Sequence, residues 1–229
     1  MATATGLLQP QVESNIGTEG YLPKERQIRA QFDGETITVY QAYNSHIASS
    51  AVQHQRLSSS PHFRPGRMTW IKPSWCWMMY RSGYSYKDRN QEHILALKMK
   101  HEHFIKLLKG ARLTTKPGQP AVPKGAADDN AAKEKTTSVR VQWDPERSPR
   151  LEKLSYRNIQ VGIPGSLAKT WADDFIVEIQ DVTGKARSLE KELRVNQTIT
   201  EQELIEKGLV PLERDYTIPI EVQERIGMV

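Results

Sequence analysis

Polar and aromatic side chains collect at the ends of three expected strands, and their types could bind a phosphorylated ligand. The first strand ends in Tyr40, Gln41 and Tyr43. The second is bordered by Arg67, Thr69, Lys72 and Ser74, and the third carries Tyr156, Arg157 and Gln160. A guanidinium can hold a phosphate through two parallel hydrogen bonds, and a tyrosine ring offers a flat stacking surface. A structural role competes with this interpretation, since a tyrosine on a strand is often a core-edge residue.

Several common catalytic signatures are absent from the sequence. It contains neither a G-x-x-x-x-G-K-[ST] phosphate loop nor a G-x-G-x-x-G dinucleotide turn, and no G-x-S-x-G nucleophile elbow. The run His101-Glu102-His103 lacks the H-E-x-x-H spacing of a zinc site, so we expect these side chains to be solvated. Hydrolytic and zinc chemistry are therefore disfavoured, and no metal is expected.

The amino-acid composition is that of a basic protein with a largely polar sequence. The formal net charge is +5, and the isoelectric point near 9.2 is compatible with RNA, DNA or a nucleotide phosphate as partner. The single cysteine, Cys76, excludes an intrachain disulfide and is expected to be buried within "SWCWMMY". Neither a secretory leader nor an apolar run long enough for a membrane span is present, so we expect a cytoplasmic or nuclear protein.

The composition along the chain predicts one domain with two poorly structured stretches. Residues 1–24 are expected to be a flexible N-terminal tail. Residues 109–138 are rich in Lys, Ala, Pro and Gly, and such a segment buries too little to offset the entropy of ordering. We therefore expect a single domain over residues 25–229, with a low-complexity loop inserted at about 109–138.

Hydrophobic periodicity predicts an α+β fold with a mixed sheet of about six strands and short flanking helices. The expected strands are 36–43, 67–73, 93–100, 139–144, 156–163 and 175–183, and the expected helices include 45–55, 74–83 and 102–110. Ser74 and Gly83 are suited to start and end their helix, and Pro145 is expected to end the strand before it. Thr200 and Glu203 form a capping-box pattern at the start of a late helix.

Five segments resemble a domain-of-unknown-function family known for its QAY motif. They are "VYQAY", "GRMTWIKPSW", "VQWDPER", "YRNIQVG" and "EIQDVT". The resemblance covers about residues 26–183, together with the later "LVPLERDYTIP". It implies membership of that family and carries no activity with it.

A more distant resemblance links the chain to ADP-ribosyltransferase-like domains. Residues 38–57 are similar to the opening strand of such domains, "MTWIKPSW" to their second strand and "ILALKMK" to the strand after it. This resemblance implies a split-sheet architecture with an NAD pocket. Gln41 stands where that pattern favours Arg or His, and Gln160 stands near the position of the catalytic Glu. A glutamine cannot stabilise an oxocarbenium-like cation as an anion would, so Glu146 or Glu178 would have to supply the charge.

The resemblance also implies a role for each candidate residue. Tyr40 and Tyr43 would stack on nicotinamide or adenine, Arg67 and Arg157 would hold the pyrophosphate, and Thr69 or Ser74 would contact ribose, with Gln41 in the same pocket. Gln160 or Glu178 would orient the ribose. The RNA 2′-phosphotransferase branch uses several arginines and a histidine, for which this chain offers Arg81 and His46.

These features lead to an expected function and two alternatives. The first is an NAD-dependent transferase of the ADP-ribosyl class that acts on nucleic acid or a phosphorylated RNA end. The second is a non-catalytic nucleotide- or RNA-binding module that uses the same cleft. The third is a scaffold protein, in which Trp70, Trp75 and Trp77 pack the core or anchor a partner. The expected partner is a nucleotide or nucleic acid, RNA foremost, with no membrane involved and a protein partner left open.

Overall fold

Two main β-sheets form the framework of the computed structural model, which describes residues 23–114 and 138–229. The first sheet has the order β2-β4-β8 and contains β2 (Thr36–Tyr43), β4 (His93–Lys100) and β8 (Ile176–Asp181). All pairs in it are antiparallel. The alternation of β-branched and aromatic residues in 36–43 explains why this segment is extended along its whole length.

The second sheet has the order β3-β7-β6-β5. It contains β3 (Thr69–Ile71), β7 (Lys153–Ile163), β6 (Val139–Arg147) and β5 (Ala111–Leu113). β5 pairs parallel to β6, and the other two pairs are antiparallel. A short third pair joins β1 (Arg29–Ala30) to β9 (Arg214–Asp215), near the two ends of the described chain.

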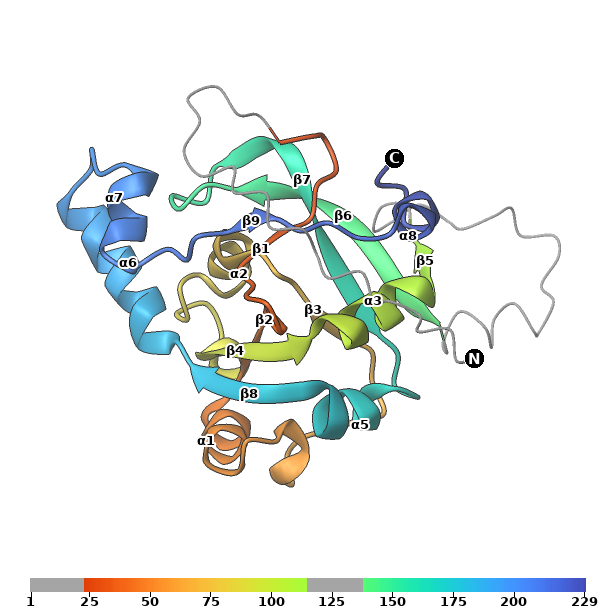
Figure 1. The fold of residues 1–229 in the computed structure, drawn as a ribbon. Coiled ribbons are helices and arrows are strands. Elements are labelled where there is room, and N and C mark those ends of the chain that lie inside the picture. Colours follow the sequence, from red (N-terminus) through yellow and green to blue (C-terminus); the bar gives the residue numbers. More distant parts are fainter. Residues whose placement is uncertain (1–22, 115–137) are drawn as a thin grey trace, which may run out of the picture.

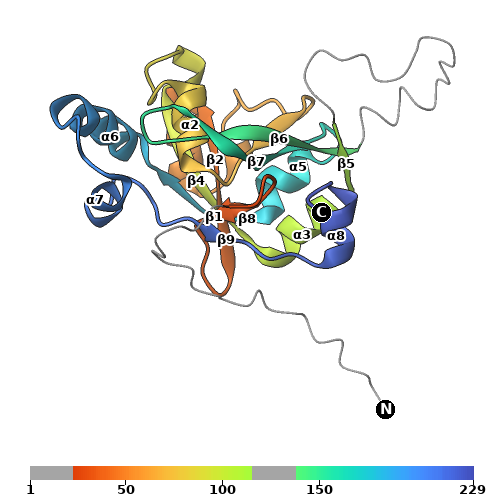
Figure 2. The same ribbon diagram turned by 90° about the horizontal axis from the view of Figure 1, so that it is seen from above.

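Helices cover the outside of the two sheets. Those in the first half are α1 (Ser45–His54), η1 (Leu57–Ser59), α2 (Trp75–Ser82), η2 (Arg89–Gln91) and α3 (His101–Lys109). Those in the second half are α5 (Ala168–Thr170), η3 (Trp171–Phe175), α6 (Thr183–Val195), α7 (Glu201–Glu206) and α8 (Ile220–Arg225). α6 and α7 lie at one end of the molecule, and α3 and α8 lie at the opposite end (Figures 1 and 2). None of the described helices is long and apolar enough to cross a membrane.

The two main sheets meet at a single backbone bridge. The Tyr40 N–H donates to the Lys72 carbonyl over 2.8 Å, which joins β2 to the residue that follows β3. From this point β2 continues toward Tyr43 beside β4, while β3 continues beside β7. β2 and β3 therefore belong to different sheets, and the polar residues at the end of β2 lie near those of β3.

The apolar residues form two buried clusters. The larger includes Val39, Leu97, Val161 and Trp171 and lies between the main sheets and their covering helices. The smaller includes Tyr40, Trp75 and Leu189, and it packs α2 and α6 against the face of β2 and β4. Each cluster contains residues from distant parts of the chain, so both halves of the described chain share one folded unit.

The α+β class expected from the sequence is confirmed, while its sheet arrangement differs. The described residues form nine strands in three sheets, where one mixed sheet of about six strands was expected. The expected break at Pro145 is wrong: β6 runs on to Arg147 through a register shift between Pro145 and Arg147. β6 pairs with β5 only as far as Val141, so Pro145 lies where no described strand neighbours that side of β6, and a proline is tolerated there.

The expected unstructured stretches fall largely outside the described residues. The expected tail, residues 1–24, is described only at residues 23 and 24. The loop expected at about 109–138 includes residues that are structured: Lys109 is the last residue of α3, and residues Ala111–Leu113 form β5. Ala111 is buried in the main core, and its strand pairs with β6, which explains why this segment is ordered despite its polar composition. Residues 115–137 lie outside the described part.

Helix boundaries follow the local capping signals closely. Ser74 caps α2 by accepting a hydrogen bond from the Trp77 N–H at 3.0 Å, and Gly83 ends the helix in the left-handed conformation. The capping box of Thr200 and Glu203 is present at α7. Asn44 caps α1 through its side chain.

Candidate functional site

A cleft of about 670 Å³ opens where the two sheets diverge from the Tyr40–Lys72 bridge. One wall is the end of β2, from Tyr40 to Tyr43, and the facing wall is β3 with the start of α2. Gln142 of β6 and Gln160 of β7 lie opposite each other in the register and contribute to the same lining. The volume is in the range of pockets that hold small molecules and cofactors.

The side chains that line the cleft are cationic, aromatic and amide-bearing. The cations are Arg67, Lys72 and Arg81. The aromatic residues are Tyr40, Tyr43, Trp70 and Trp77. The amides are Gln41, Asn90, Gln91, Gln142 and Gln160. Over the described residues, this lining includes no aspartate and no glutamate. The cleft therefore suits a ligand that combines negative charge with a planar group.

Gln41 closes one wall of the cleft by linking β2 to β3. Its amide nitrogen donates to the Thr69 hydroxyl over 2.7 Å and to the Trp70 carbonyl over 3.0 Å. The Tyr43 hydroxyl donates to the Gln41 side-chain oxygen over 2.8 Å. Burial raises the pKa of Tyr43, so its hydroxyl stays protonated as this donor. Gln41 and Thr69 thus hold the wall in place, and their polar groups are used within the protein.

The tyrosines of the cleft differ in what they can offer a ligand. Tyr40 is only 3% exposed and packs edge-on against Trp75, so its ring belongs to the core and is not available for stacking. Tyr43 is half-buried, and its ring lies near Phe63. The half-buried indoles of Trp70 and Trp77 are the other planar surfaces of the lining.

Lys72 is the most deeply placed cation of the cleft. Its side chain is 1% exposed, its Nζ lies 3.3 Å from Asp144 Oδ2, and the ammonium lies 4.2 Å from the ring centroid of Trp77. Burial lowers the pKa of Lys72 to about 8, against the opposing effect of the Asp144 carboxylate. Gln142 donates to the other oxygen of Asp144 over 3.0 Å and so orients the carboxylate.

Arg67 and Arg81 are exposed at the border of the cleft. Within the described residues neither guanidinium has a hydrogen-bond or ion-pair partner. The Gln160 amide is likewise without a hydrogen-bond partner in that part of the chain. These three groups can therefore contact a ligand without first giving up a contact inside the protein.

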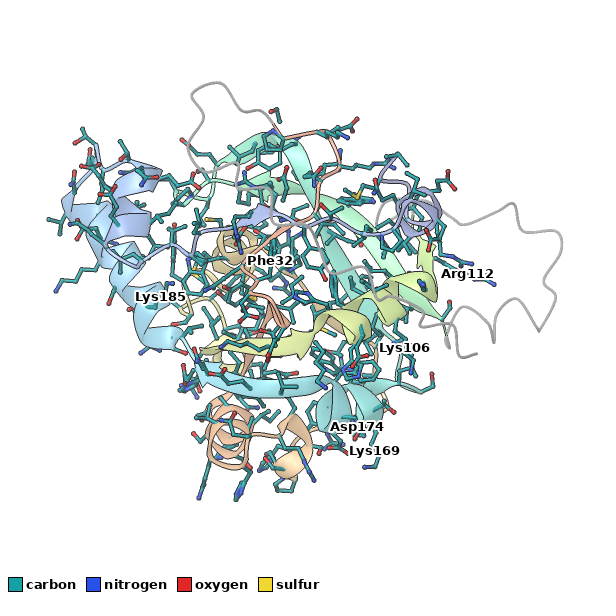
Figure 3. All side chains as sticks on the ribbon, viewed as in Figure 1. Phe32, Lys106, Arg112, Lys169, Asp174 and Lys185 are labelled. Atoms are coloured by element: carbon teal, nitrogen blue, oxygen red, sulfur yellow. The ribbon has the colours of Figure 1, made fainter. Side chains whose placement is uncertain are left out.

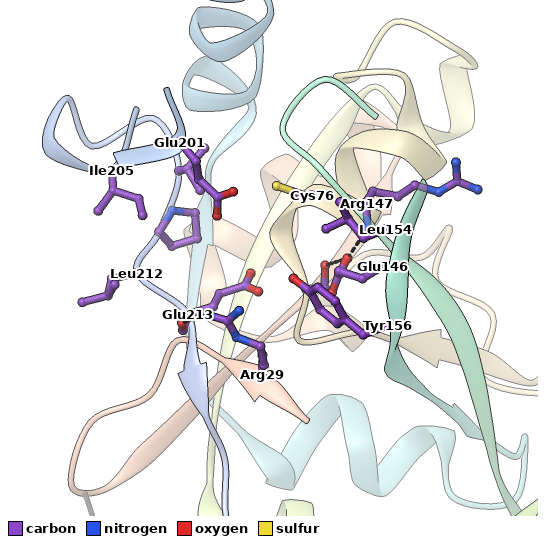
Figure 4. Close-up of a pocket in the computed structure, with 13 residues that line it drawn as sticks. Arg29, Cys76, Glu146, Arg147, Leu154, Tyr156, Glu201, Ile205, Leu212 and Glu213 are labelled. Atoms are coloured by element: carbon purple, nitrogen blue, oxygen red, sulfur yellow. Dashed lines mark hydrogen bonds between the residues drawn. The ribbon is translucent and has the colours of Figure 1, made fainter. Parts of the chain in front are cut away.

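A second, smaller pocket of about 60 Å³ is lined by residues that include Ser74 and Cys76 (Figure 4). Glu146, Glu201 and Glu213 point toward it, with Arg29 and Tyr156 between them (Figure 4). Glu146 accepts hydrogen bonds from Ser74, Asn158 and the Arg147 N–H, and Glu213 accepts one from the Trp75 N–H.

The polar groups of this second pocket have a structural role. Burial, together with nearby Glu146, raises the pKa of Glu213. Burial also raises the pKa of the Cys76 thiol, which makes it a poor nucleophile. Over the described residues no cluster of His, Cys, Asp and Glu has the arrangement needed to hold a metal ion. The hydrogen bonds to Glu146 and Glu213 instead attach α2 to β6 and to the segment before β9.

The cleft brings together six of the ten residues that the sequence indicated. These are Tyr40, Gln41, Tyr43, Arg67, Thr69 and Gln160. Ser74 lines the second pocket, where it is fully buried as the cap of α2. Arg157 lies away from the cleft and bonds the Trp143 carbonyl and the Glu25 carboxylate.

The two remaining candidates, Glu178 and His46, also lie outside the cleft. Glu178 is on β8, paired with Lys98 at 2.6 Å. His46 is exposed on α1, with its ring 5.0 Å from that of His62. The strand order explains this result for Glu178, because β8 is separated from β2 by β4, and His46 lies on α1, which begins beyond the last cleft residue of β2, Tyr43.

Sequence reasoning did not single out Gln142, and it noted Lys72 and Arg81 without placing either in the pocket. Lys72 and Arg81 were visible as basic residues beside the second strand and its helix. Gln142 had a usable signal, since it alternates with the apolar residues Val141 and Trp143 and must therefore face the opposite side of β6. The sequence indicated that Trp75 and Trp77, two residues apart on a helix, cannot share a face, and in the structure Trp75 is buried while Trp77 lines the cleft.

The fold and the cleft define an α+β protein with two diverging sheets and a cationic, aromatic pocket between them. The model of a protein family matches residues 27–216, which include both sheets and every residue of the cleft. The chain belongs to that family, which is described as a domain of unknown function, DUF4291. No curated protein matches the chain.

Proposed function

We propose that the cleft binds a nucleotide, with its phosphates on the arginines and its base on the indoles. The observation that carries this proposal is the lining itself, in which Arg67, Lys72 and Arg81 stand beside Trp70 and Trp77. Carboxylates, which would repel a phosphate, are not part of the described lining. A nucleotide is the common ligand class that is both strongly anionic and planar.

The two arginines supply the phosphate-binding part. Each is exposed at the cleft border, and neither is engaged within the described residues. Arg is suited to phosphate because its fork of donors can make two parallel hydrogen bonds. Hydrogen bonds to charged groups contribute about 1.5–3 kcal/mol each, so two arginines are sufficient to dominate the affinity.

The indoles and the free amides supply the part that holds the base and sugar. Stacking of a base on an aromatic side chain contributes about 1–3 kcal/mol. The Trp70 ring packs closely against Gly162, since a Cβ built at Gly162 would lie 2.9 Å from the ring. The Gln160 amide can contact base edges or ribose hydroxyls, because both its donors and its acceptor are available.

NAD is the first dinucleotide to test in this cleft, and transfer of ADP-ribose to a nucleic acid or phosphorylated RNA end stays a prediction. Neither of the two carboxylates expected to serve that transfer contributes to the lining: Glu178 is on β8, and Glu146 lines the second pocket. Binding of a nucleotide or of an RNA end without turnover is therefore the stronger proposal. It needs only the cations, the indoles and the amides.

Isothermal titration calorimetry with ATP, NAD, ADP-ribose and a short 2′-phosphorylated RNA tests this proposal. We expect binding of at least one ligand, weakened at least about tenfold in the double variant Arg67→Ala/Arg81→Ala. The matched control is Lys191→Ala/Arg194→Ala, which removes the same charge from exposed positions on α6, a helix that contributes no residue to the cleft. Equal weakening in both double variants, or binding of none of the ligands, would refute the proposal.

A further inference from the structure

Lys72 has an environment that differs from those of the two arginines in the same cleft. Its side chain is 1% exposed, and its ammonium lies between the Asp144 carboxylate and the face of Trp77. A lysine is almost never fully buried unless it is paired, and here the pair is a single contact of 3.3 Å. The other nearby carboxylates are already engaged, Glu146 by Ser74 and Asn158 and Glu213 by the Trp75 N–H.

This environment raises the fraction of neutral amine above that of an exposed lysine. Burial lowers the pKa of Lys72 to about 8, so a substantial fraction of the side chain is uncharged in mildly alkaline solution. A desolvated lysine with a lowered pKa is an activated nucleophile, and a carboxylate within reach can take up the proton that such a reaction releases. Asp144 is that carboxylate, and Gln142 holds it from the side away from Lys72.

We propose that Lys72 is the nucleophile of a nucleotidyl-transfer reaction and carries a nucleoside monophosphate as a covalent intermediate. This proposal rests on nucleotide binding in the cleft. The neutral Nζ attacks the α-phosphorus of the bound donor and forms an N–P bond. The bond from that phosphorus to the bridging oxygen breaks, and its electron pair leaves with the departing group. A proton from Nζ passes to the Asp144 carboxylate.

The donor can be a nucleoside triphosphate or NAD, because both present a nucleoside monophosphate joined through a phosphoanhydride. With a triphosphate the departing group is pyrophosphate, and with NAD it is nicotinamide mononucleotide. A divalent cation bound to a nucleoside triphosphate donor would neutralise charge on the departing pyrophosphate. Arg67 and Arg81 line the same cleft and are suited to hold that group as its negative charge develops.

Trp77 determines the access of a donor to Nζ. Its ring lies against the ammonium, and the residue is half-buried at the cleft surface. Because Lys72 is 1% exposed and Trp77 lines the cleft beside it, we expect a donor to reach Nζ by displacing this indole. Trp77 is therefore a positioning residue, which shields the amine from water until a nucleotide base displaces or stacks on the indole.

The test is intact-mass spectrometry of the full chain after incubation with each of the four nucleoside triphosphates and Mg²⁺, and separately with NAD. We expect a mass increase of one nucleoside monophosphate with at least one donor, lost in acid and retained in alkali, as for a phosphoramidate. Peptide mapping of the wild-type protein should place the group on Lys72. The donor that labels the chain distinguishes the triphosphate from NAD.

Variants of two lysines give the matched comparison. Lys72→Arg keeps a cation beside Asp144 and should abolish labelling. Lys185→Arg is the control, because Lys185 also lies over an indole, 5.2 Å from the centroid of Trp75, and burial also lowers its pKa, but it is on α6 and outside the cleft (Figure 3). Circular dichroism shows whether each variant is folded, and the wild-type peptide map locates the label even if Lys72→Arg does not fold.

The outcomes separate this proposal from nucleotide binding itself. If calorimetry shows a nucleotide bound in the cleft and no donor adds mass, the covalent step is refuted and nucleotide binding stands. A label that maps to another residue also refutes it. If no nucleotide binds, both proposals fail together.

Discussion

Gln41 has every polar atom of its side chain engaged inside the protein. Its amide hydrogens reach Thr69 and Trp70 on β3, and its oxygen accepts from Tyr43 on its own strand. The residue is 5% exposed, so these hydrogen bonds are not replaceable by water. Gln41 therefore has a structural role in joining β2 to β3 at the cleft. A ligand would form its hydrogen bonds with other residues of the lining.

Replacing Gln41 with Leu should destabilise the protein by about 2 kcal/mol or more, because it leaves the buried Tyr43 hydroxyl without its acceptor and the Trp70 carbonyl without its donor. Urea unfolding followed by tryptophan fluorescence measures the change. Gln53→Leu, at an exposed position of α1, is the control and should stay within about 0.5 kcal/mol of the wild type. Similar losses in both variants would show that Gln41 has no special structural role.

Lys72 should make stability depend on pH in the alkaline range. Its pKa is about 8 in the folded protein and about 10.5 in an unfolded chain, so between these values the unfolded state binds more protons. The free energy of unfolding contributed by Lys72 therefore rises as pH increases from about 8 to about 10.

Urea unfolding of the wild type and of Lys72→Met across this pH range isolates that contribution. Lys185, whose pKa is also lowered by burial, is present in both proteins, so its effect cancels in the difference. The wild type should gain stability relative to Lys72→Met as pH rises. A difference that is constant or falls with pH would mean that Lys72 keeps an ordinary pKa in the folded protein.

At the scale of elements, the pairing of β3 with β7 controls the position of Trp70. Trp70 lies opposite Gly162 in the register, and its ring occupies the place where a side chain on residue 162 would be. Only a residue without Cβ allows this close approach. The position of the Trp70 indole is therefore determined by Gly162 on the neighbouring strand, β7.

Gly162→Ala should destabilise the protein by about 1–3 kcal/mol and weaken nucleotide binding, because the new methyl group displaces the Trp70 ring. Gly184→Ala is the matched control: nothing lies within 4 Å of a Cβ at this position of α6, and alanine favours a helix, so stability should rise by up to about 1 kcal/mol. Thermal unfolding and the calorimetric titration measure both effects. Unchanged binding in a folded Gly162→Ala would exclude Trp70 as a stacking surface.

Ser74 joins two elements through one hydroxyl. It accepts from the Trp77 N–H to cap α2, and it donates to Glu146 on β6 over 2.7 Å. Ser74→Ala should therefore cost about 2 kcal/mol, since it removes a cap and leaves a buried carboxylate with one donor fewer. Thr200→Ala removes a cap of α7 that is exposed to water, and about 1 kcal/mol is expected there. Equal losses would show that the bond to Glu146 contributes nothing measurable.

For the whole molecule, the C-terminal segment connects distant parts of the fold. Tyr216 hydrogen-bonds His101 at the start of α3, and the Trp143 indole N–H donates to the Ile226 carbonyl over 2.8 Å. α8 packs on α3 and β5, next to the larger core cluster. The family match ends at residue 216, so this packing continues beyond the matched region.

Removal of residues 219–229 should lower stability by about 3 kcal/mol or more, because Val222 and Ile226, which are 1% and 0% exposed, are lost from the core. The fluorescence of Trp143 should shift to the red as its indole meets water. A chain that lacks only Val229, which is 62% exposed, is the control and should unfold like the wild type. Identical unfolding of the two truncated chains would mean that α8 is not part of the cooperative unit.

Much of the local structure of this protein could be predicted from the sequence. The alternation in 36–43 and 93–100 indicated β2 and β4, and Ser74, Gly83, Thr200 and Glu203 indicated where helices begin or end. These signals depend on neighbours a few residues away, so they are complete within a short segment.

The composition of the cleft required the tertiary fold. Whether the side chains near Gln41 and Arg67 meet Gln160, and whether Arg157 or Glu178 joins them, depends on strand order and register between segments far apart in the chain. A shift of one residue reverses the face of every side chain in a strand, and the local pattern does not record which strand is the neighbour. The burial of Lys72 beside Asp144 arises in the same way, because two separate strands, β3 and β6, must be brought together before either residue has its partner.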